Sequence, residues 1–193
     1  MSIHTKLSND NNSCETGVQQ RWRYAEMDIH RISHDHVEEI HKLMLDVVSR
    51  LPSGALFAMD DEDYLHDLLK RKGEIYGAFD NGKLVAYTVL ALPGIGSGNL
   101  GREFGVPEEE LSRVGVFDAT IVHESVRGRG LQRFFIDLRE RRAKTLGCLH
   151  LYSTVHPDNE ASRRNLEAAR FVLQFTRQMY GGHPRHCYTK RLQ

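Results

Sequence analysis

The tripeptide Asp80-Asn81-Gly82 separates two apolar runs, residues 74–79 and 83–90. Asn-Gly readily adopts the positive φ angles that a tight two-residue turn needs, and such a turn between apolar runs indicates paired strands. The segment therefore predicts an antiparallel β-hairpin in the middle of the chain. Any sheet that the chain forms should contain this antiparallel pair.

The spacing of apolar residues, with Gly and Pro at segment ends, predicts the other elements. We expect helices after Ser33, after Asp60 and at 131–146 and 157–169, and further strands at 22–28, 114–123, 148–155, 171–180 and 185–192. This order predicts an α/β fold with a mixed, mostly antiparallel central sheet of about seven strands and helices on both faces. Residues 1–20 are polar and predict a disordered tail, which leaves 21–193 as a single domain.

Charge excludes one class of function. The chain has 26 Lys and Arg and 26 Asp and Glu, so its formal net charge is zero, unlike that of a uniformly basic nucleic-acid-binding protein. The charges are unevenly distributed, because residues 1–126 hold 12 basic and 21 acidic residues while residues 127–193 hold 14 and 5. An anionic ligand should therefore bind the C-terminal third, unless the basic residues only form solvated helix faces.

Cysteine usage and hydropathy bear on the compartment. The three cysteines, Cys14, Cys148 and Cys187, form no CxxC pair, which disfavours a disulfide scaffold or a zinc knuckle. No apolar run approaches the roughly 18 residues of a membrane span. We expect a cytoplasmic protein that binds no metal and no membrane, and we interpret the histidines near the first helix as solvated.

The most informative segment is Val122-His123-Glu124-Ser125-Val126-Arg127-Gly128-Arg129-Gly130-Leu131-Gln132, where a strand passes through a glycine-rich turn into a helix. Glycines let the backbone approach a ligand closely, and the free amides of a helix N-terminus bind phosphate. The spacing matches neither a Walker A loop nor a dinucleotide fingerprint. A pyrophosphate site is one interpretation of this turn, and a plain turn is the other.

With the later Val155-His156-Pro157-Asp158-Asn159-Glu160-Ala161-Ser162, this segment resembles the GNAT acetyltransferase superfamily, most strongly between Asp118 and Phe171. In that family the glycine-rich turn binds the pyrophosphate of acetyl-CoA, a strand edge pairs with pantetheine, and an Asn contacts the pantetheine arm. The resemblance implies acetyl-CoA as cosubstrate, held by Ile121, Val122, Arg127, Gly128, Arg129, Gly130, Leu131, Gln132, Asn159 and Ser162. Gln132 stands where the family has Gly or Ala, and Asn159 could equally be a helix N-cap.

Acetyl transfer to an amine needs a base, an oxyanion donor and an acid for the leaving thiolate. Strand alternation places Val116, Asp118, Thr120 and Val122 on one face, where Asp118 is the one ionisable residue. The resemblance implies that Asp118 is the general base and that the backbone N–H of Val122 is the oxyanion donor. A carboxylate that only orients a loop or pairs with an Arg is the alternative for Asp118. Leu166 stands where the family often has a tyrosine, so no general acid is assigned.

The function predicted from these residues is transfer of acetyl from acetyl-CoA to a primary amine by direct attack. The acceptor, a small molecule or a peptide, should lie between the first two helices, residues 93–112 and the last hairpin. Because of Leu166 and Gln132, a non-catalytic acyl-CoA-binding module of the same fold is the alternative. We expect no nucleic-acid partner, and the oligomeric state stays open between monomer and homodimer.

Overall fold

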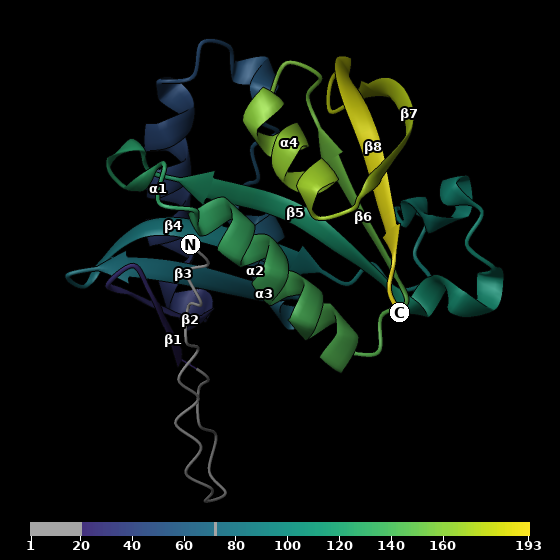
Figure 1. The fold of residues 1–193 in the computed structure, drawn as a ribbon, viewed down its shortest axis with the longest axis horizontal. Coiled ribbons are helices and arrows are strands. Elements are labelled where there is room, and N and C mark those ends of the chain that lie inside the picture. Colours follow the sequence, from purple (N-terminus) through teal and green to yellow (C-terminus); the bar gives the residue numbers. More distant parts are fainter. Residues whose placement is uncertain (1–20, 72) are drawn as a thin grey trace, which may run out of the picture.

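The computed structural model describes residues 21–71 and 73–193, and the tail predicted for 1–20 lies outside them. One mixed sheet runs through the described chain in the order β1-β2-β3-β4-β5-β6-β8-β7 (Figure 1). Its strands are β1 (Arg21–Tyr24), β2 (Met27–Ile32), β3 (Glu74–Asp80), β4 (Lys83–Ala91), β5 (Val114–Val122), β6 (His150–Val155), β7 (Val172–Met179) and β8 (His183–Arg191). Every neighbouring pair is antiparallel except β5 and β6, which are parallel. The predicted α/β class and mostly antiparallel sheet are confirmed.

The additional strand arises at the N-terminal end of the domain. The segment predicted as one strand, 22–28, is instead two strands, β1 and β2, joined by a turn in which Ala25 and Glu26 have positive φ. Neither residue type favours that conformation, so the sequence carried no turn signal there. The Asn81-Gly82 turn joins β3 to β4 as predicted.

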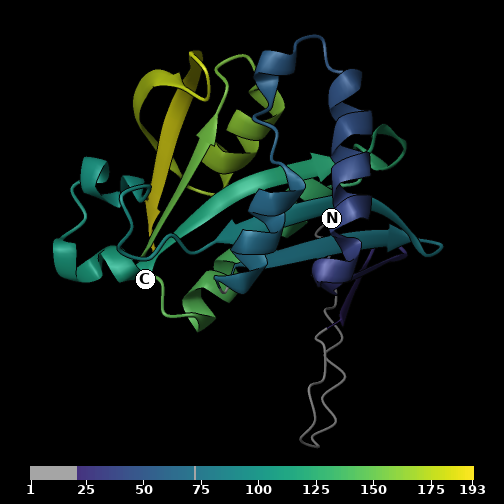
Figure 2. The ribbon, with the colours of Figure 1, turned by 180° about the vertical axis from the view of Figure 1, so that it is seen from behind.

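Helices cover both faces of the sheet, as predicted (Figures 1 and 2). Helices α1 (Val37–Ser49) and α2 (Glu62–Lys70) pack on one face, and α3 (Leu131–Thr145) and α4 (Glu160–Ala168) lie on the other. A short 3-10 turn, His34–His36, separates Ser33 from α1, whose N-cap is His36. Asp61 caps α2 by accepting a hydrogen bond from Tyr64 N.

Residues 93–112 form a folded excursion with two 3-10 helices, Leu100–Phe104 and Glu108–Arg113. The buried side chain of Asn99 ties it together by donating to the carbonyl oxygens of Gly94 and Leu111. Phe104 packs its ring against Tyr152 and Phe175. The excursion therefore rests on β6 and β7.

Strands β5 and β6 separate after a short pairing. Their register covers only Val114–Val116 against His150–Tyr152, although β5 continues to Val122 and β6 to Val155. A gap therefore opens in the middle of the sheet, and unpaired backbone groups face it.

Candidate active site

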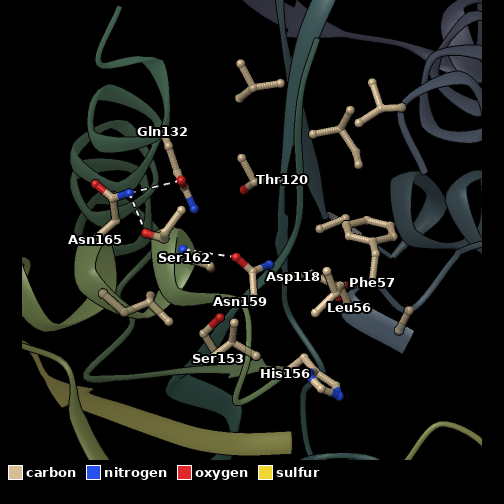
Figure 3. A pocket seen from close by; sticks show the side chains of 18 of the residues that line it. Leu56, Phe57, Asp118, Thr120, Gln132, Ser153, His156, Asn159, Ser162 and Asn165 are labelled. Atoms are coloured by element: carbon tan, nitrogen blue, oxygen red, sulfur yellow. Dashed lines mark hydrogen bonds between the residues drawn. The ribbon is translucent and has the colours of Figure 1, made fainter. Parts of the chain in front are cut away.

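A cavity of about 970 Å³ crosses this gap and reaches both faces of the sheet. Figure 3 shows Gln132, Asn159, Ser162 and Asn165 on the side of α3 and α4, and Leu56 and Phe57 on the opposite side of β5. Residues 58–61, Tyr64, Tyr180 and Arg185 also line the cavity. The two halves have different chemistry: a glycine-rich helix start forms one and a group of carboxyl and phenol side chains the other.

The glycine-rich turn forms the first half. Gly128 and Gly130 have φ angles of 75° and 81°, and Gly130 is the N-cap of α3 with no side chain capping the helix. The first amides of α3 have no intrahelical acceptors, so they are free to bind an anion. Arg127, Gly128, Gly130, Leu131 and Gln132, which the resemblance implies for acetyl-CoA, line the cavity.

Arg129 departs from this pattern. It is exposed, it is absent from the cavity wall, and its Nη2 lies 3.5 Å from the carbonyl oxygen of Ser125. The role of Arg129 in binding the cofactor stays a prediction.

Asn159 is the N-cap of α4, where its Oδ1 accepts a hydrogen bond from Ser162 N at 3.2 Å. The alternative noted for Asn159 is thus present, and its amide nitrogen makes no hydrogen bond to another described residue. Asn165, which the sequence analysis did not select, donates to Gln132 Oε1 at 3.0 Å. This bond joins α4 to the start of α3. The side chain of Gln132, which stands where the family has Gly or Ala, is thus held by a residue of α4.

The edge of β5 offers backbone groups to the gap. His123 N donates to Val85 O, so Val122 and Ala86 form a non-hydrogen-bonded pair. The N–H of Val122 therefore points away from β4 and toward the gap, and its carbonyl oxygen accepts from Arg127 Nε at 3.1 Å. By the same alternation the backbone of Ile121 faces β4, which corrects its expected pairing with pantetheine. Thr120 presents its backbone groups to the gap instead, and Ile121 is a residue of the cavity wall.

A bulge in β5 positions Asp118. The β4–β5 register shifts between Thr88 and Leu90, so two residues of β5, Asp118 and Ala119, stand opposite Val89. The predicted common face of Asp118, Thr120 and Val122 is therefore wrong. Ala119 packs with the helix α1 core, and the Oδ2 of Asp118 accepts a hydrogen bond from the hydroxyl of Tyr64 on α2. Asp118 thus lies on the α1/α2 side of the gap.

Two carboxyl groups of this half have raised pKa values. Burial raises the pKa of Asp118, and the hydrogen bond from Tyr64 and the charge of Arg139 partly offset the shift. Burial together with the charges of Asp118 and Asp61 raises the pKa of Asp60 to about 8. The Oδ2 of Asp60 is enclosed and has no partner among the described residues. Strongly shifted carboxyls that line one cavity are typical of catalytic or binding sites.

Arg139 and Arg142 depart from the solvated helix face that was one interpretation of the basic residues in the C-terminal third. Arg139 is 3% exposed, donates to Val89 O at 3.1 Å, and lies 4.2 Å above the centroid of the Phe117 ring. Arg142 donates hydrogen bonds from Nε and Nη2 to the two carboxylate oxygens of the buried Glu74. Both arginines therefore belong to the packing between α3 and the sheet.

The remaining predictions concern residues 93–112, Cys148, Leu166, metal binding and membrane spans. No residue of 93–112 lines the cavity, so the acceptor region predicted there is limited to the first two helices and the last hairpin. Cys148 is buried and free, and Leu166 is buried within the cavity wall. The described residues contain no cluster of three metal-ligating side chains, and no helix among them is long and apolar enough to cross a membrane.

Tyr64, Tyr180 and Arg185 line the site but were not predicted for it from the sequence. Tyr64 lies 54 residues from Asp118, and nothing in the local pattern relates the two. The acidic run around Asp60 was noticed, but charge runs are usually solvated.

The chain matches the family model described as the acetyltransferase (GNAT) family over residues 40–170, within the single domain predicted for 21–193. The protein therefore belongs to the GNAT acetyltransferase family. No curated protein matches the chain in sequence.

Solved structures share the fold at low identity. A phosphinothricin acetyltransferase of Sinorhizobium meliloti in complex with acetyl-CoA has a TM-score of 0.67 and 13% identity, covering 86% of this chain and 88% of that one. An N-acetyltransferase of Staphylococcus aureus has a TM-score of 0.65 and 13% identity, covering 86% and 98%. A ribosomal-protein-alanine N-acetyltransferase of Brucella melitensis has a TM-score of 0.63 and 15% identity, covering 85% and 99%.

Proposed function

We propose that the protein transfers acetyl from acetyl-CoA to the nitrogen of a primary amine by direct attack. One observation carries this proposal: Asp118 and the free N–H of Val122 line the same cavity as the N-terminus of α3, which no side chain caps. A base, an oxyanion donor and an anion site then serve a single bound pair of substrates. The acetyl-CoA complex of the Sinorhizobium meliloti neighbour supports the choice of acyl donor.

The α3/α4 half suits coenzyme A. The left-handed glycines Gly128 and Gly130 leave the amides at the start of α3 open to a pyrophosphate, with Arg127 as a nearby cation. The extended pantetheine would enter the gap and pair with backbone groups of Thr120 and Val122, beside Asn159. This placement directs the thioester toward Asp118.

Asp118 serves as the general base. The incoming ammonium must lose a proton before its lone pair can attack the thioester carbonyl, and a carboxylate of raised pKa accepts that proton more readily than an ordinary Asp. The N–C bond forms, and the carbonyl oxygen develops negative charge toward the N–H of Val122. Collapse breaks the C–S bond, the nitrogen releases its second proton to solvent, and the thiolate takes a proton from water. No side chain is assigned as general acid.

The acceptor is proposed to be a small molecule or a peptide amine, bound at the α1/α2 half. We retain the cytoplasm as the compartment, which suits the free, buried Cys148 and Cys187. Neither nucleic acid nor membrane is proposed as a partner.

Retained coenzyme A in the purified protein, detected by native mass spectrometry, followed by a screen of amines for thiol release, tests the function. We expect Asp118→Asn to keep acetyl-CoA affinity and to lose about 10²-fold or more in kcat, the range of a general base. An unchanged rate would refute the role of Asp118. A wild-type protein that binds acetyl-CoA tightly and acetylates no amine would instead be the non-catalytic binding module.

A further inference from the structure

Arg185 is a buried cation with an unused donor in the cavity wall. It is 2% exposed, lies on β8, and its Nη1 donates to Ala55 O at 2.8 Å. Its Nη2 is enclosed and has no hydrogen-bond partner in the part of the chain that the structure describes. No carboxylate of that part lies within ion-pair distance of it, although the residue lines the cavity. An enclosed guanidinium without a counter-ion is costly, so an anion from outside would compensate it.

A second polar group without a partner lines the same cavity. The Oδ2 of Asp60 is enclosed and unpartnered too, and Asp60 forms no ion pair with Arg185. Tyr180 reports on both groups, since after burial the charges of Asp118 and Asp60 raise its pKa and the charge of Arg185 lowers it. The guanidinium carbon of Arg185 lies 5.5 Å from the centroid of the Tyr180 ring. Arg185 therefore lies beside Tyr180, and Asp60 lines the same cavity without contacting Arg185.

We propose that the acceptor is a small amino acid, whose carboxylate binds Nη2 of Arg185 while its amino group meets Asp118 and Asp60. This inference rests on the proposed function and names its substrate class. A zwitterion satisfies both unpartnered groups together. A polyamine leaves the guanidinium without an anion, and a peptide N-terminus presents an uncharged amide where the carboxylate is needed.

The experiment compares acceptors that share a side chain and differ in the carboxylate. Phenylalanine, phenylalaninamide and phenethylamine form one set, and the leucine and glutamate sets are built in the same way, with thiol release followed at saturating acetyl-CoA. We expect kcat/KM for at least one free amino acid to exceed that of its amide and its decarboxylated amine by about 30-fold, as for loss of a bond between charged groups. The less basic amine of the amide would favour the opposite order, so this preference reports on the carboxylate.

Arg185→Gln and Arg185→Lys then test the residue. In Arg185→Gln the ratio of kcat/KM for amino acid over decarboxylated amine should fall to within about 3-fold of one, while Arg185→Lys, which keeps a cation, should retain part of it. The ratio is measured within one preparation, so it does not depend on the folded fraction. Arg163→Gln is the matched control, because Arg163 also donates to a carbonyl oxygen and has an enclosed unpartnered nitrogen but does not line the cavity.

The outcomes separate this inference from the function on which it rests. Amines or amides accepted as well as amino acids, or an unchanged ratio in Arg185→Gln, would refute the amino-acid acceptor and leave amine acetylation intact. Acetyl-CoA binding with no turnover of any compound in the sets would refute both.

Discussion

The hydroxyl of Tyr64, on α2, donates a hydrogen bond to Oδ2 of Asp118 on β5. Burial and the nearby charge of Asp118 raise the pKa of Tyr64, so the phenol stays neutral and acts as a donor. The same bond lowers the pKa of Asp118 against the effect of burial. Tyr64 therefore orients the proposed base and favours its carboxylate form.

We predict that Tyr64→Phe moves the acidic limb of the pH profile of kcat/KM to higher pH. Asp118 must be ionised to accept a proton, and removing the donor raises its pKa, so activity should fall most on the acidic limb and recover as the pH rises. On that limb a decrease of about 10-fold corresponds to a rise of one pKa unit. Tyr188→Phe is the control, since it also removes a phenol bonded to a carboxylate, that of Glu167, outside the cavity wall. Equal losses at all pH values in Tyr64→Phe would contradict this role.

Asp60→Asn should stabilise the protein at alkaline pH. A carboxyl whose pKa is raised to about 8 in the fold binds more protons folded than unfolded between pH 4 and 8, so its contribution to the free energy of unfolding decreases over that window. Asn carries no such penalty. We expect the variant to gain about 1 kcal/mol or more at pH 8 relative to pH 4, which is a rise of about 2–4 °C in Tm. Thermal unfolding at the two pH values measures the difference, and a gain that is equal at both would count against the buried carboxyl.

The effect of Glu74→Gln on the free energy of unfolding should depend on pH in the opposite sense to that of Asp60→Asn. Glu74 is 2% exposed and accepts hydrogen bonds from Arg142 and from the hydroxyl of Tyr76. Burial raises its pKa, but these partners outweigh burial and leave the pKa lowered, so the charge stabilises the fold above the unfolded pKa and this contribution is lost as the pH falls. We expect a loss of about 1–3 kcal/mol at pH 7 and a smaller loss at pH 3. Denaturant unfolding at both pH values tests it, and Glu38→Gln, in an exposed pair with Lys42, should change little.

Local signals in the sequence predicted the parts of the site that lie close together along the chain. The Asn81-Gly82 turn, the glycines before α3 and the cap at Asn159 each depend on residues within a few positions. The contacts in the α1/α2 half of the cavity could not be predicted from local signals. The bulge that turns Asp118 toward α2 has no residue signature, and its partner Tyr64 is distant in sequence.

Arg139 shows a second limit of sequence reasoning. An Arg on a helix is usually solvated, but Arg139 follows Phe135 by one turn and so lies on the buried face of α3, where Val89 O and the Phe117 ring receive it. The four-residue spacing from Phe135 to Arg139 is present in the sequence. Whether the guanidinium is solvated or buried depends on where β4 and β5 lie, which the sequence does not show. Tertiary contacts outweighed residue preference at this position.

Gly130→Ala should weaken acetyl-CoA binding more than it destabilises the fold. Gly130 has φ 81°, where an L-residue costs about 1–2 kcal/mol, and its added Cβ would lie 2.6 Å from the hydroxyl of Tyr24. Tyr24 packs on Phe134 of α3, so relief of the clash would disturb the start of the helix. Gly147→Ala is the matched control, because Gly147 has φ 79° with open space around it at the far end of α3. We expect similar losses of Tm in the two variants. The Kd for acetyl-CoA, measured by calorimetry, should rise several-fold only in Gly130→Ala. Equal Kd values in both variants would show that the α3 N-terminus does not hold the pyrophosphate.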